Sequence, residues 1–292
     1  MRVWQQPLPA IYNELSEAEL RVRIQSAREY LGSKLAILGH HYQQDAVIEF
    51  ADFTGDSFEL SRKAADQRGI QYVIFCGVHF MAESADILTP DNVRVILPDL
   101  GAGCSMADMA NLDQTLECWE QLQSTCPGQR IVPITYMNSS AAIKAFVGEH
   151  GGAVCTSSNC RNVLEWALND TSAGVTMPGT EPAGAPKTKI LFFPDQHLGR
   201  NTAYAMGYPL DRMALWDPRE DLGGNDARSL RQADFVLWKG HCSVHQLFRP
   251  EHVDQVRDKY LDMKVIVHPE CRWEVVQKAD MTGSTAMIVK TI

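Results

Sequence analysis

The sequence contains no apolar run that approaches the ~20 residues needed to span a membrane. Its first residues, MRVWQQPLPAIYNEL, hold no continuous apolar core of the kind that a signal peptide carries. Basic residues are also few, because 27 Lys and Arg stand against 36 Asp and Glu and the net charge is -9. Nucleic acids and anionic membranes call for basic patches, so we expect neither as a partner. The sequence predicts a cytosolic protein that holds anionic substrates with local donors.

No two of the eight cysteines have the CxxC spacing, which argues against a structural zinc site. A reducing cytosol argues against disulfides. A site built from these thiols would therefore take one ligand from each of several distant loops. Cys118 and Cys126 fall on a predicted helix and its end, and we expect them to be inert. The roles of four others stay open: Cys76, Cys155, Cys160 and Cys271.

The chain does contain a strand with a polar tip, repeated three times. Residues 36–57, AILGHHYQQDAVIEFADFTGDS, pass from an apolar strand to His-His-Tyr and then to Gly-Asp-Ser, which opens an amphipathic segment. The pattern returns as RIVPITYMNSS with CTSSN, and again as KVIVHPEC with ADMTGST. Open α/β sheets bind ligands beyond the carboxyl ends of their strands. We therefore expect three copies of one parallel α/β unit, with a site at these strand ends.

A helical pattern precedes the first strand of each copy, at residues 15–31, 112–123 and 249–261, and Ser16 and Glu19 have capping-box spacing. These helices set the predicted unit boundaries at 1–112, 113–247 and 248–292. Residues 171–187, rich in Gly and Pro, are interpreted as a surface loop. The chain ends soon after ADMTGST. We therefore expect the third unit to be incomplete, with Met287, Ile288 and Val289 as uncovered strand surface.

The strand ends carry a different mixture of groups in each copy: His40, His41 and Tyr42; Tyr136 and Asn138; His268 and Glu270. A lone histidine at such a position is more often a hydrogen-bonded core residue than a catalyst. Imidazole, phenol, amide and carboxylate at one repeated position instead suit acid–base catalysis on a small polar molecule.

Two cysteines, Cys104 and Cys242, each follow a glycine closely and precede a serine, beyond the last strand of a unit. A single free cysteine is usually a small buried apolar residue. Matched placement in two repeats instead favours ligands of an iron–sulfur cluster.

Hydroxyl and carboxyl groups open a helical stretch in every copy, at Asp56-Ser57, at residues 156–159 and at Ser284-Thr285. Ordinary N-capping is the commonest use of such residues. If the three caps meet at one centre, they form cradles for carboxylate or phosphate.

Taken in order, these motifs resemble the quinolinate synthase family, the iron–sulfur enzymes of de novo NAD synthesis. The resemblance runs through ILGHHYQ, ADFTGDS, CGVHFMAESADIL, LPDLGAGCSMADM, TYMNSSA, CTSSN, FFPDQHLGR, WKGHCSVH, HPEC and ADMTGST. It implies three α/β domains around a pseudo-threefold axis. It also implies condensation of iminoaspartate with dihydroxyacetone phosphate to quinolinate, with release of phosphate and water, and a functional link to L-aspartate oxidase.

The resemblance also implies roles for individual residues. Cys104 and Cys242 match two of three cysteines that hold a [4Fe–4S] cluster, whose fourth iron binds substrate, and the third cysteine is not present in this chain. Isolated, the chain is therefore expected to retain no stable cluster. The substrate-binding set is His40, Ser57, Tyr136, Asn138, Ser157, His268, Glu270, Ser284 and Thr285. The catalytic set is Glu270 as general base, with Tyr136, His40, Tyr42 and His245.

Two other hypotheses stay open at this point. A zinc metallohydrolase would use His40, His41 and His268 with Glu270, but the sequence lacks HExxH spacing and the thiols would be idle. The other is an inactive truncated paralogue that binds a phosphometabolite. Metal analysis of anaerobically purified protein separates the three hypotheses. Iron and sulfide favour the iron–sulfur enzyme, zinc favours the hydrolase, and neither favours the inactive paralogue.

Overall fold

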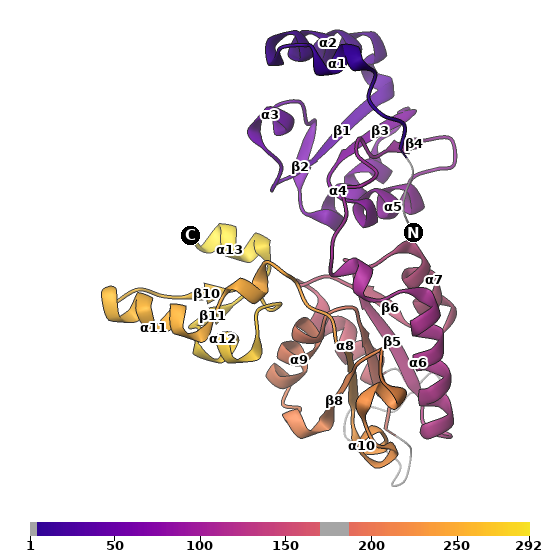
Figure 1. Ribbon diagram of the computed structural model, residues 1–292, viewed down its shortest axis with the longest axis vertical. Coiled ribbons are helices and arrows are strands. Elements are labelled where there is room, and N and C mark those ends of the chain that lie inside the picture. Colours follow the sequence, from indigo (N-terminus) through magenta and orange to yellow (C-terminus); the bar gives the residue numbers. More distant parts are fainter. Residues whose placement is uncertain (1–4, 170–186) are drawn as a thin grey trace. The chain divides into compact units, whose positions relative to one another are not determined.

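The computed structural model describes residues 5–169 and 187–292. Nearly all of the predicted surface loop at 171–187 therefore lies outside the described residues. The chain forms two compact units, residues 1–104 and 105–292, and each is described by itself (Figure 1). Within the described ranges, no helix has both the length and the apolar character that crossing a membrane requires.

The first unit is built on a parallel four-stranded sheet in the order β2-β1-β3-β4. Its strands are β1 (Leu35–His40), β2 (Phe53–Gly55), β3 (Tyr72–Cys76) and β4 (Arg94–Ile96). Its helices are α1 (Ala10–Asn13), α2 (Glu17–Leu31), the 3-10 turn η1 (Gly32–Lys34), α3 (Asp45–Ile48), α4 (Ser57–Asp66) and α5 (His79–Leu88). After its first residue β1 is fully buried, as expected for an interior strand of a parallel sheet. Helices α4 and α5 pack on each other, and α4 packs on β1.

The second unit contains a parallel five-stranded sheet in the order β6-β5-β7-β9-β8. Its strands are β5 (Ile131–Tyr136), β6 (Ala153–Cys155), β7 (Lys189–Phe193), β8 (Met213–Trp216) and β9 (Phe235–Trp238). Its helices and 3-10 turns are η2 (Ala107–Met109), α6 (Leu112–Thr125), α7 (Ala141–Glu149), α8 (Cys160–Asn169), α9 (Gln196–Ala205), η3 (Leu210–Arg212), η4 (Asp221–Gly224), α10 (Ala227–Gln232) and η5 (His245–Leu247). Every residue of β5, β7 and β9 is buried, so these strands form the centre of the core.

The C-terminal part of the second unit adds a small parallel sheet of two strands, β10 (Ile266–Val267) and β11 (Met281–Thr282). Around it lie α11 (Pro250–Lys259), α12 (Trp273–Lys278) and α13 (Thr285–Thr291). Its core is a small cluster of Val253, Cys271 and Val275. The prediction of repeated parallel α/β sheets is confirmed, and the last sheet is the smallest.

One local prediction is confirmed, and one is wrong. The Ser16 side chain accepts a hydrogen bond from Glu19 N, so the capping box at the start of α2 is present. Met287 and Val289 were expected as strand surface, but they lie in helix α13 and are exposed. The cause is the Ser284 hydroxyl, which accepts a hydrogen bond from Met287 N and starts a helix there.

The strand registers align the three copies residue by residue. His40 in β1 pairs with Gly55, and Tyr136 in β5 pairs with Cys155. In the third copy the last pair is Val267 in β10 with Thr282. His268 directly follows Val267 at the end of β10. His40, Tyr136 and His268 therefore occupy equivalent strand ends, as the repeat predicts.

Candidate functional site

Glu270 is the centre of the best-defined group of polar side chains in the second unit. It follows β10 in a turn and is only 3% exposed. Its Oε2 lies 3.0 Å from His245 Nδ1 and 3.5 Å from His268 Nδ1. The two imidazole rings are stacked, with centroids 4.7 Å apart and planes 18° apart. A carboxylate held between two imidazoles is suited to receiving and passing on protons.

Tyr136 and Asp195 extend this group. Burial, followed by the negative charge of Glu270, raises the pKa of Tyr136 well above its usual value. The same two causes raise the pKa of Asp195 to about 8. Asp195 caps α9 by accepting a hydrogen bond from Leu198 N at 2.6 Å through Oδ2. Its Oδ1, like Glu270 Oε1, is buried and has no hydrogen-bond partner among the described residues.

The two histidines beside Glu270 differ in protonation. Burial lowers the pKa of His268 to about 4 and outweighs the attraction of Glu270. Burial also opposes the protonation of His245, but its contacts with Cys242 and Glu270 outweigh burial and raise the pKa of His245 to about 10. One imidazole is thus neutral and the other cationic at neutral pH, which gives the carboxylate two neighbours of different character.

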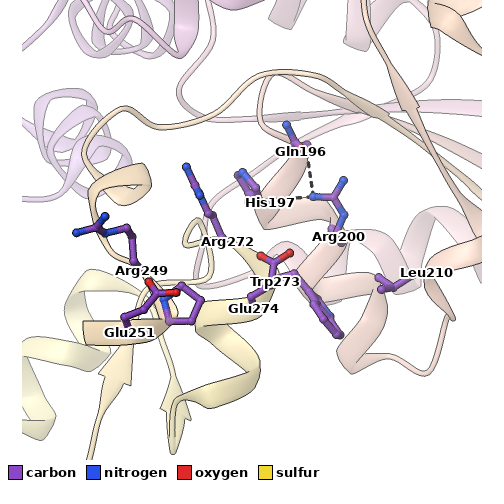
Figure 2. Close-up of a pocket in the computed structure, with 10 residues that line it drawn as sticks. Gln196, His197, Arg200, Leu210, Arg249, Glu251, Arg272, Trp273 and Glu274 are labelled. Atoms are coloured by element: carbon purple, nitrogen blue, oxygen red, sulfur yellow. Dashed lines mark hydrogen bonds between the residues drawn. The ribbon is translucent and has the colours of Figure 1, made fainter. Parts of the chain in front are cut away.

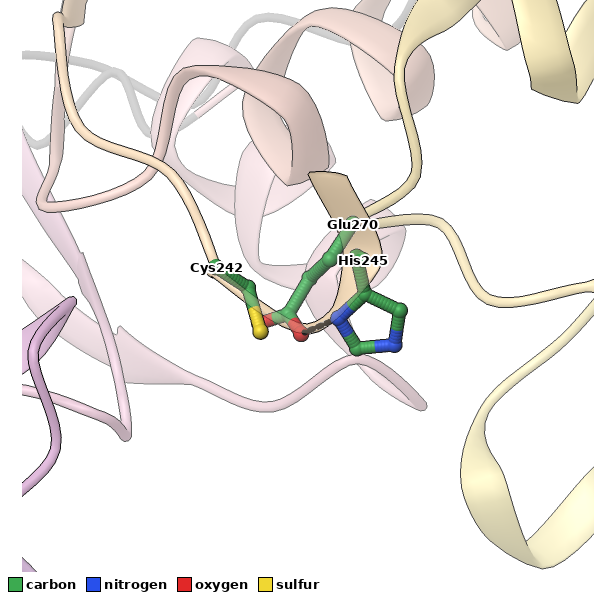
Figure 3. Close-up of side chains that lie close together, drawn as sticks. All are labelled: Cys242, His245 and Glu270. Carbon is green, nitrogen blue, oxygen red and sulfur yellow. Dashed lines mark ion pairs between the residues drawn. The ribbon is translucent and has the colours of Figure 1, made fainter. Parts of the chain in front are cut away.

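Cys242 lies beside this group, in the loop that follows β9. Its thiol, a His245 nitrogen and a Glu270 oxygen all lie within 4.8 Å of one another (Figure 3). The loop is fixed by Gly240, whose carbonyl oxygen accepts a hydrogen bond from Gln196 N at 3.1 Å.

Cys104 occupies the equivalent place in the first unit. The first residue of α5, His79, donates from its backbone N to Ala102 O at 2.9 Å, two residues before Cys104. The first residue of α9 makes the matching bond to Gly240, two residues before Cys242. Both cysteines are partly exposed, whereas Cys118 and Cys126 are buried in the core around α6. The two cysteines therefore follow matching backbone hydrogen bonds, each made two residues before the thiol.

The other four cysteines are less suited to bind a metal ion. Cys155, Cys160 and Cys271 are buried, and Cys76 is partly buried. Burial first, and then its neighbour Cys160, raise the pKa of the Cys155 thiol well above its usual value. A buried thiol of raised pKa is a poor ligand because metals bind the thiolate.

His40 and Tyr42 form a compact group in the first unit. Their rings lie 3.9 Å apart, and Tyr42 N donates to His40 Nδ1 at 3.4 Å. Burial lowers the pKa of His40 to about 3 and raises that of Tyr42 to about 12. The second cause of the Tyr42 shift is the charge of Cys104, so the predicted ligand thiol lies near this pair.

Three hydroxyl residues follow the second strand of each copy at the same distance. Ser57 and Ser157 lie two positions beyond Gly55 and Cys155, the partners of His40 and Tyr136. Thr285 lies two positions beyond Gly283, the residue opposite His268 when the register of β10 and β11 is continued by one step. All three are partly buried. Beside them, the capping interpretation holds for Asp56, whose carboxylate accepts from Glu59 N, and for Ser284. Asn138 lies two residues past Tyr136 and is also partly buried.

A cavity of about 730 Å³ lies close by in the second unit (Figure 2). Its lining comes from the first half of α9, the start of η3, the segment that enters α11 and the start of α12: Gln196, His197, Arg200, Leu210, Arg249, Pro250, Glu251, Arg272, Trp273 and Glu274. Gln246 connects it to the His245 segment, because its side chain lies 2.7 Å from His197 Nε2 and accepts from Arg272 Nε at 2.5 Å.

The structure also contains contributors that no sequence pattern assigned. Asn201, on α9, donates from Nδ2 to Pro269 O at 2.7 Å and to Cys271 O at 2.8 Å, on both sides of Glu270. Asp195 lies two residues beyond the end of β7, and a polar residue just past a buried strand is the signal that could have marked it. A polar residue on the buried face of α9 is the signal that marks Asn201.

Comparisons with known proteins agree with these motifs. Residues 22–292 match the family described as Quinolinate synthetase A protein. The quinolinate synthase of Acidobacterium capsulatum is 56% identical over 282 residues, which cover 96% of this chain and 71% of that protein. The enzyme of Corynebacterium glutamicum is 53% identical over 288 residues, covering 99% and 69%. That of Anoxybacillus flavithermus is 50% identical over 285 residues, covering 98% and 73%. This chain belongs to the quinolinate synthase family.

Proposed function

We propose that the chain carries out the family's reaction, the condensation of iminoaspartate with dihydroxyacetone phosphate to quinolinate, with Glu270 as the general base. The observation that carries the proposal is the placement of Glu270, which is 3% exposed and lies 3.0 and 3.5 Å from two imidazole nitrogens. Ring formation needs protons to leave carbon and to reach departing hydroxyl groups. A buried carboxylate with a cationic neighbour, His245, and a neutral one, His268, can serve both transfers.

Tyr136 is proposed to hold the intermediate rather than to act as a base. Its raised pKa keeps the phenol protonated at neutral pH, so its hydroxyl can donate a hydrogen bond to a developing oxyanion. Asn138 lies two residues further along the same strand end and offers an amide to the same molecule. His40 and Tyr42 are proposed to bind the phosphate-bearing substrate, also through hydrogen bonds.

The anionic groups of both substrates need local donors because the chain carries a net charge of -9. We propose that Ser57, Ser157 and Thr285 supply hydroxyls to phosphate and carboxylates, with Ser284 beside them. Their equivalent positions after the second strand of each copy support this role. The zinc hydrolase hypothesis is less well supported, because Glu270 lies beside the Cys242 thiol as well as His245 and His268, and such an enzyme would leave the thiol idle.

The donor chemistry fits an iron–sulfur group. Cys104 and Cys242 are partly exposed thiols on equivalent loops, and an iron–sulfur cluster binds thiolates of this kind. These two residues would hold a [4Fe–4S] cluster, with any further ligand coming from outside the pair. When bound, the cluster would supply a Lewis-acidic iron for the dehydration chemistry.

We also propose the finer architecture of three repeats, 1–112, 113–247 and 248–292, around a pseudo-threefold axis. The residue-by-residue match of β1, β5 and β10 with their neighbours supports the repeat. A cytosolic location is proposed because the eight cysteines form no disulfide among the described residues. An oxidase that acts on L-aspartate is the class of enzyme that would supply the imine substrate.

Quinolinate formation from the two substrates tests the proposal. Protein that carries an intact cluster, as established by iron and sulfide analysis, should form quinolinate, detected by chromatography and mass spectrometry. A cluster-free preparation of the same protein should form little. Equal rates from the two preparations would contradict the proposed role of the cluster.

A further inference from the structure

Three donors of different chemistry meet at one point in the second unit. They are the Cys242 thiol from the loop after β9, the His245 imidazole at the start of η5 and the Glu270 carboxylate after β10, and their ligand atoms lie within 4.8 Å of one another (Figure 3). Among the described residues, this is the group of histidine, cysteine and acidic side chains whose donor atoms approach closely enough to share one ion.

The backbone around these donors is well fixed. Gln246 N donates to Cys242 O at 3.0 Å, which closes the turn that presents Cys242 and His245 on one side. Cys271 N donates to His268 O at 3.0 Å, which closes the turn that presents Glu270. A preformed arrangement of this kind lowers the conformational cost of binding an ion.

The nitrogen–oxygen distance suits a tetrahedral ion, and the sulfur lies within 4.8 Å of both atoms. Zinc lies ~2.0–2.1 Å from nitrogen and oxygen ligands, so tetrahedral geometry sets neighbouring donors about 3.3 Å apart. His245 Nδ1 and Glu270 Oε2 are already 3.0 Å apart. Small side-chain rotations would bring all three donors onto one ion and leave a fourth position for water.

The Glu270 carboxylate also has one oxygen that accepts no hydrogen bond from the described residues. Glu270 is 3% exposed, and its Oε1 is buried without a hydrogen-bond partner among the described residues. An unpartnered polar atom in such a place costs free energy, which a cation at the carboxylate would recover. Cys242 and His245 are partly exposed and give the ion a route from solvent.

We propose that the cluster-free chain binds one thiophilic divalent cation, Zn²⁺ or Fe²⁺, through Cys242, His245 and Glu270. Thiolate and imidazole ligands select these ions over Mg²⁺ and Ca²⁺, which prefer oxygen donors. The site differs from that of the zinc hydrolase hypothesis, which used His40, His41 and His268 with Glu270 and shares only Glu270 with it. It stands on the geometry of the second unit alone.

One consequence does rest on the proposed function. The ion occupies Cys242, which is also a proposed cluster ligand, so a chain that carries the ion cannot use that thiolate for a cluster. The mononuclear form is therefore an alternative state of the same centre that competes with cluster assembly.

Metal titration of the full chain, prepared without iron and sulfide, tests the site. Zn²⁺ affinity is measured by competition with a chromophoric chelator, and Co²⁺ is used as the optical probe because its thiolate charge-transfer band reports cysteine ligation. We expect one ion per chain with that band present. Cys242→Ser should remove the band and weaken binding by at least about tenfold, and Glu270→Gln should weaken binding while the band remains.

Cys104→Ser is the matched control, because Cys104 holds the equivalent loop position in the first unit. It should leave Co²⁺ binding unchanged, and circular dichroism confirms that each variant is folded. Absence of a stoichiometric ion in the wild type, survival of the band in Cys242→Ser or its loss in Cys104→Ser would each overturn the site. Cluster reconstitution of the wild type, measured separately, reports on the proposed function, so the two proposals can fail independently.

Discussion

Asn201 holds the backbone on both sides of Glu270. Its side-chain amide donates to Pro269 O at 2.7 Å and to Cys271 O at 2.8 Å, from a residue that is 5% exposed. Helix α9 thereby fixes the turn that carries the carboxylate, although 68 and 70 residues separate the partners in sequence.

Replacing Asn201 with Asp should displace this turn. A carboxylate of the same shape accepts hydrogen bonds only, so it faces two carbonyl oxygens that it cannot satisfy. We expect kcat to fall about tenfold or more with KM nearly unchanged, because Glu270 moves while the substrate donors stay. Unfolding stability should fall by about 1–3 kcal/mol.

A matched control separates positioning from stability. Leu122→Ala removes a fully buried side chain of the α6 core and should cost about 2–5 kcal/mol without a change in kcat at a temperature where it is folded. If Asn201→Asp and Leu122→Ala change kcat to the same extent, Asn201 has no specific effect on Glu270.

Glu270→Gln keeps the shape of the side chain but removes the proton acceptor. In cluster-loaded protein, we expect kcat to fall by about 10²–10⁴-fold while substrate binding is retained. Glu120→Gln, on the exposed side of helix α6, makes the same chemical change away from the group and the cavity and should leave kcat unchanged. Steady-state kinetics with both substrates checks the pair, and an undiminished kcat in Glu270→Gln would remove that residue from the mechanism.

Acid should weaken the fold through His197. Burial, assisted by the charge of Arg200, lowers the pKa of this histidine from 6.5 to about 3. The folded chain keeps it neutral, whereas the unfolded chain protonates it below about pH 6.5, so stability is lost as the pH falls from about 6.5 toward 3. His197→Gln should reduce the slope of unfolding free energy against pH in this window by about 1.4 kcal/mol per unit. Urea titrations at several pH values give the slopes, and identical slopes would refute the assignment.

The sequence predicted those features that depend on local pattern. The repeated strand ends, the capping box at Ser16 and the matched loops of Cys104 and Cys242 follow from periodicity, cap residues and motif order. The contact of His245 with Glu270 and the hydrogen bonds of Asn201 join segments that are far apart in the chain. Hydrophobic periodicity reports local structure only, so it cannot predict such contacts. Met287 shows a conflict between two local signals, because apolar character indicated a strand while Ser284 started a helix.

Thiol substitution should separate cluster ligands from core cysteines. Cys104→Ser and Cys242→Ser should each lower the iron and sulfide retained after anaerobic reconstitution, because each removes a thiolate of the proposed ligand set. Cys118→Ser, on the buried face of α6, should retain as much iron as the wild type in those molecules that fold. Full iron retention in Cys104→Ser would remove that residue from the ligand set.

The loop that presents Cys242 depends on a glycine. A Cβ atom at Gly240 would lie 1.9 Å from the carbonyl oxygen of Pro194, a backbone atom that cannot move aside without shifting the end of β7. Gly240→Ala should therefore displace the loop, lower unfolding stability by about 1–3 kcal/mol or more, and reduce the iron retained per chain. Gly148→Ala is the matched control, because a Cβ there meets no atom within 4 Å and the residue lies within helix α7. Alanine favours helix over glycine, so this control should be neutral or more stable by up to about 1 kcal/mol. Denaturant unfolding and iron analysis of both variants check the claim, and a Gly240→Ala protein with wild-type stability and iron content would show that close backbone packing does not position Cys242.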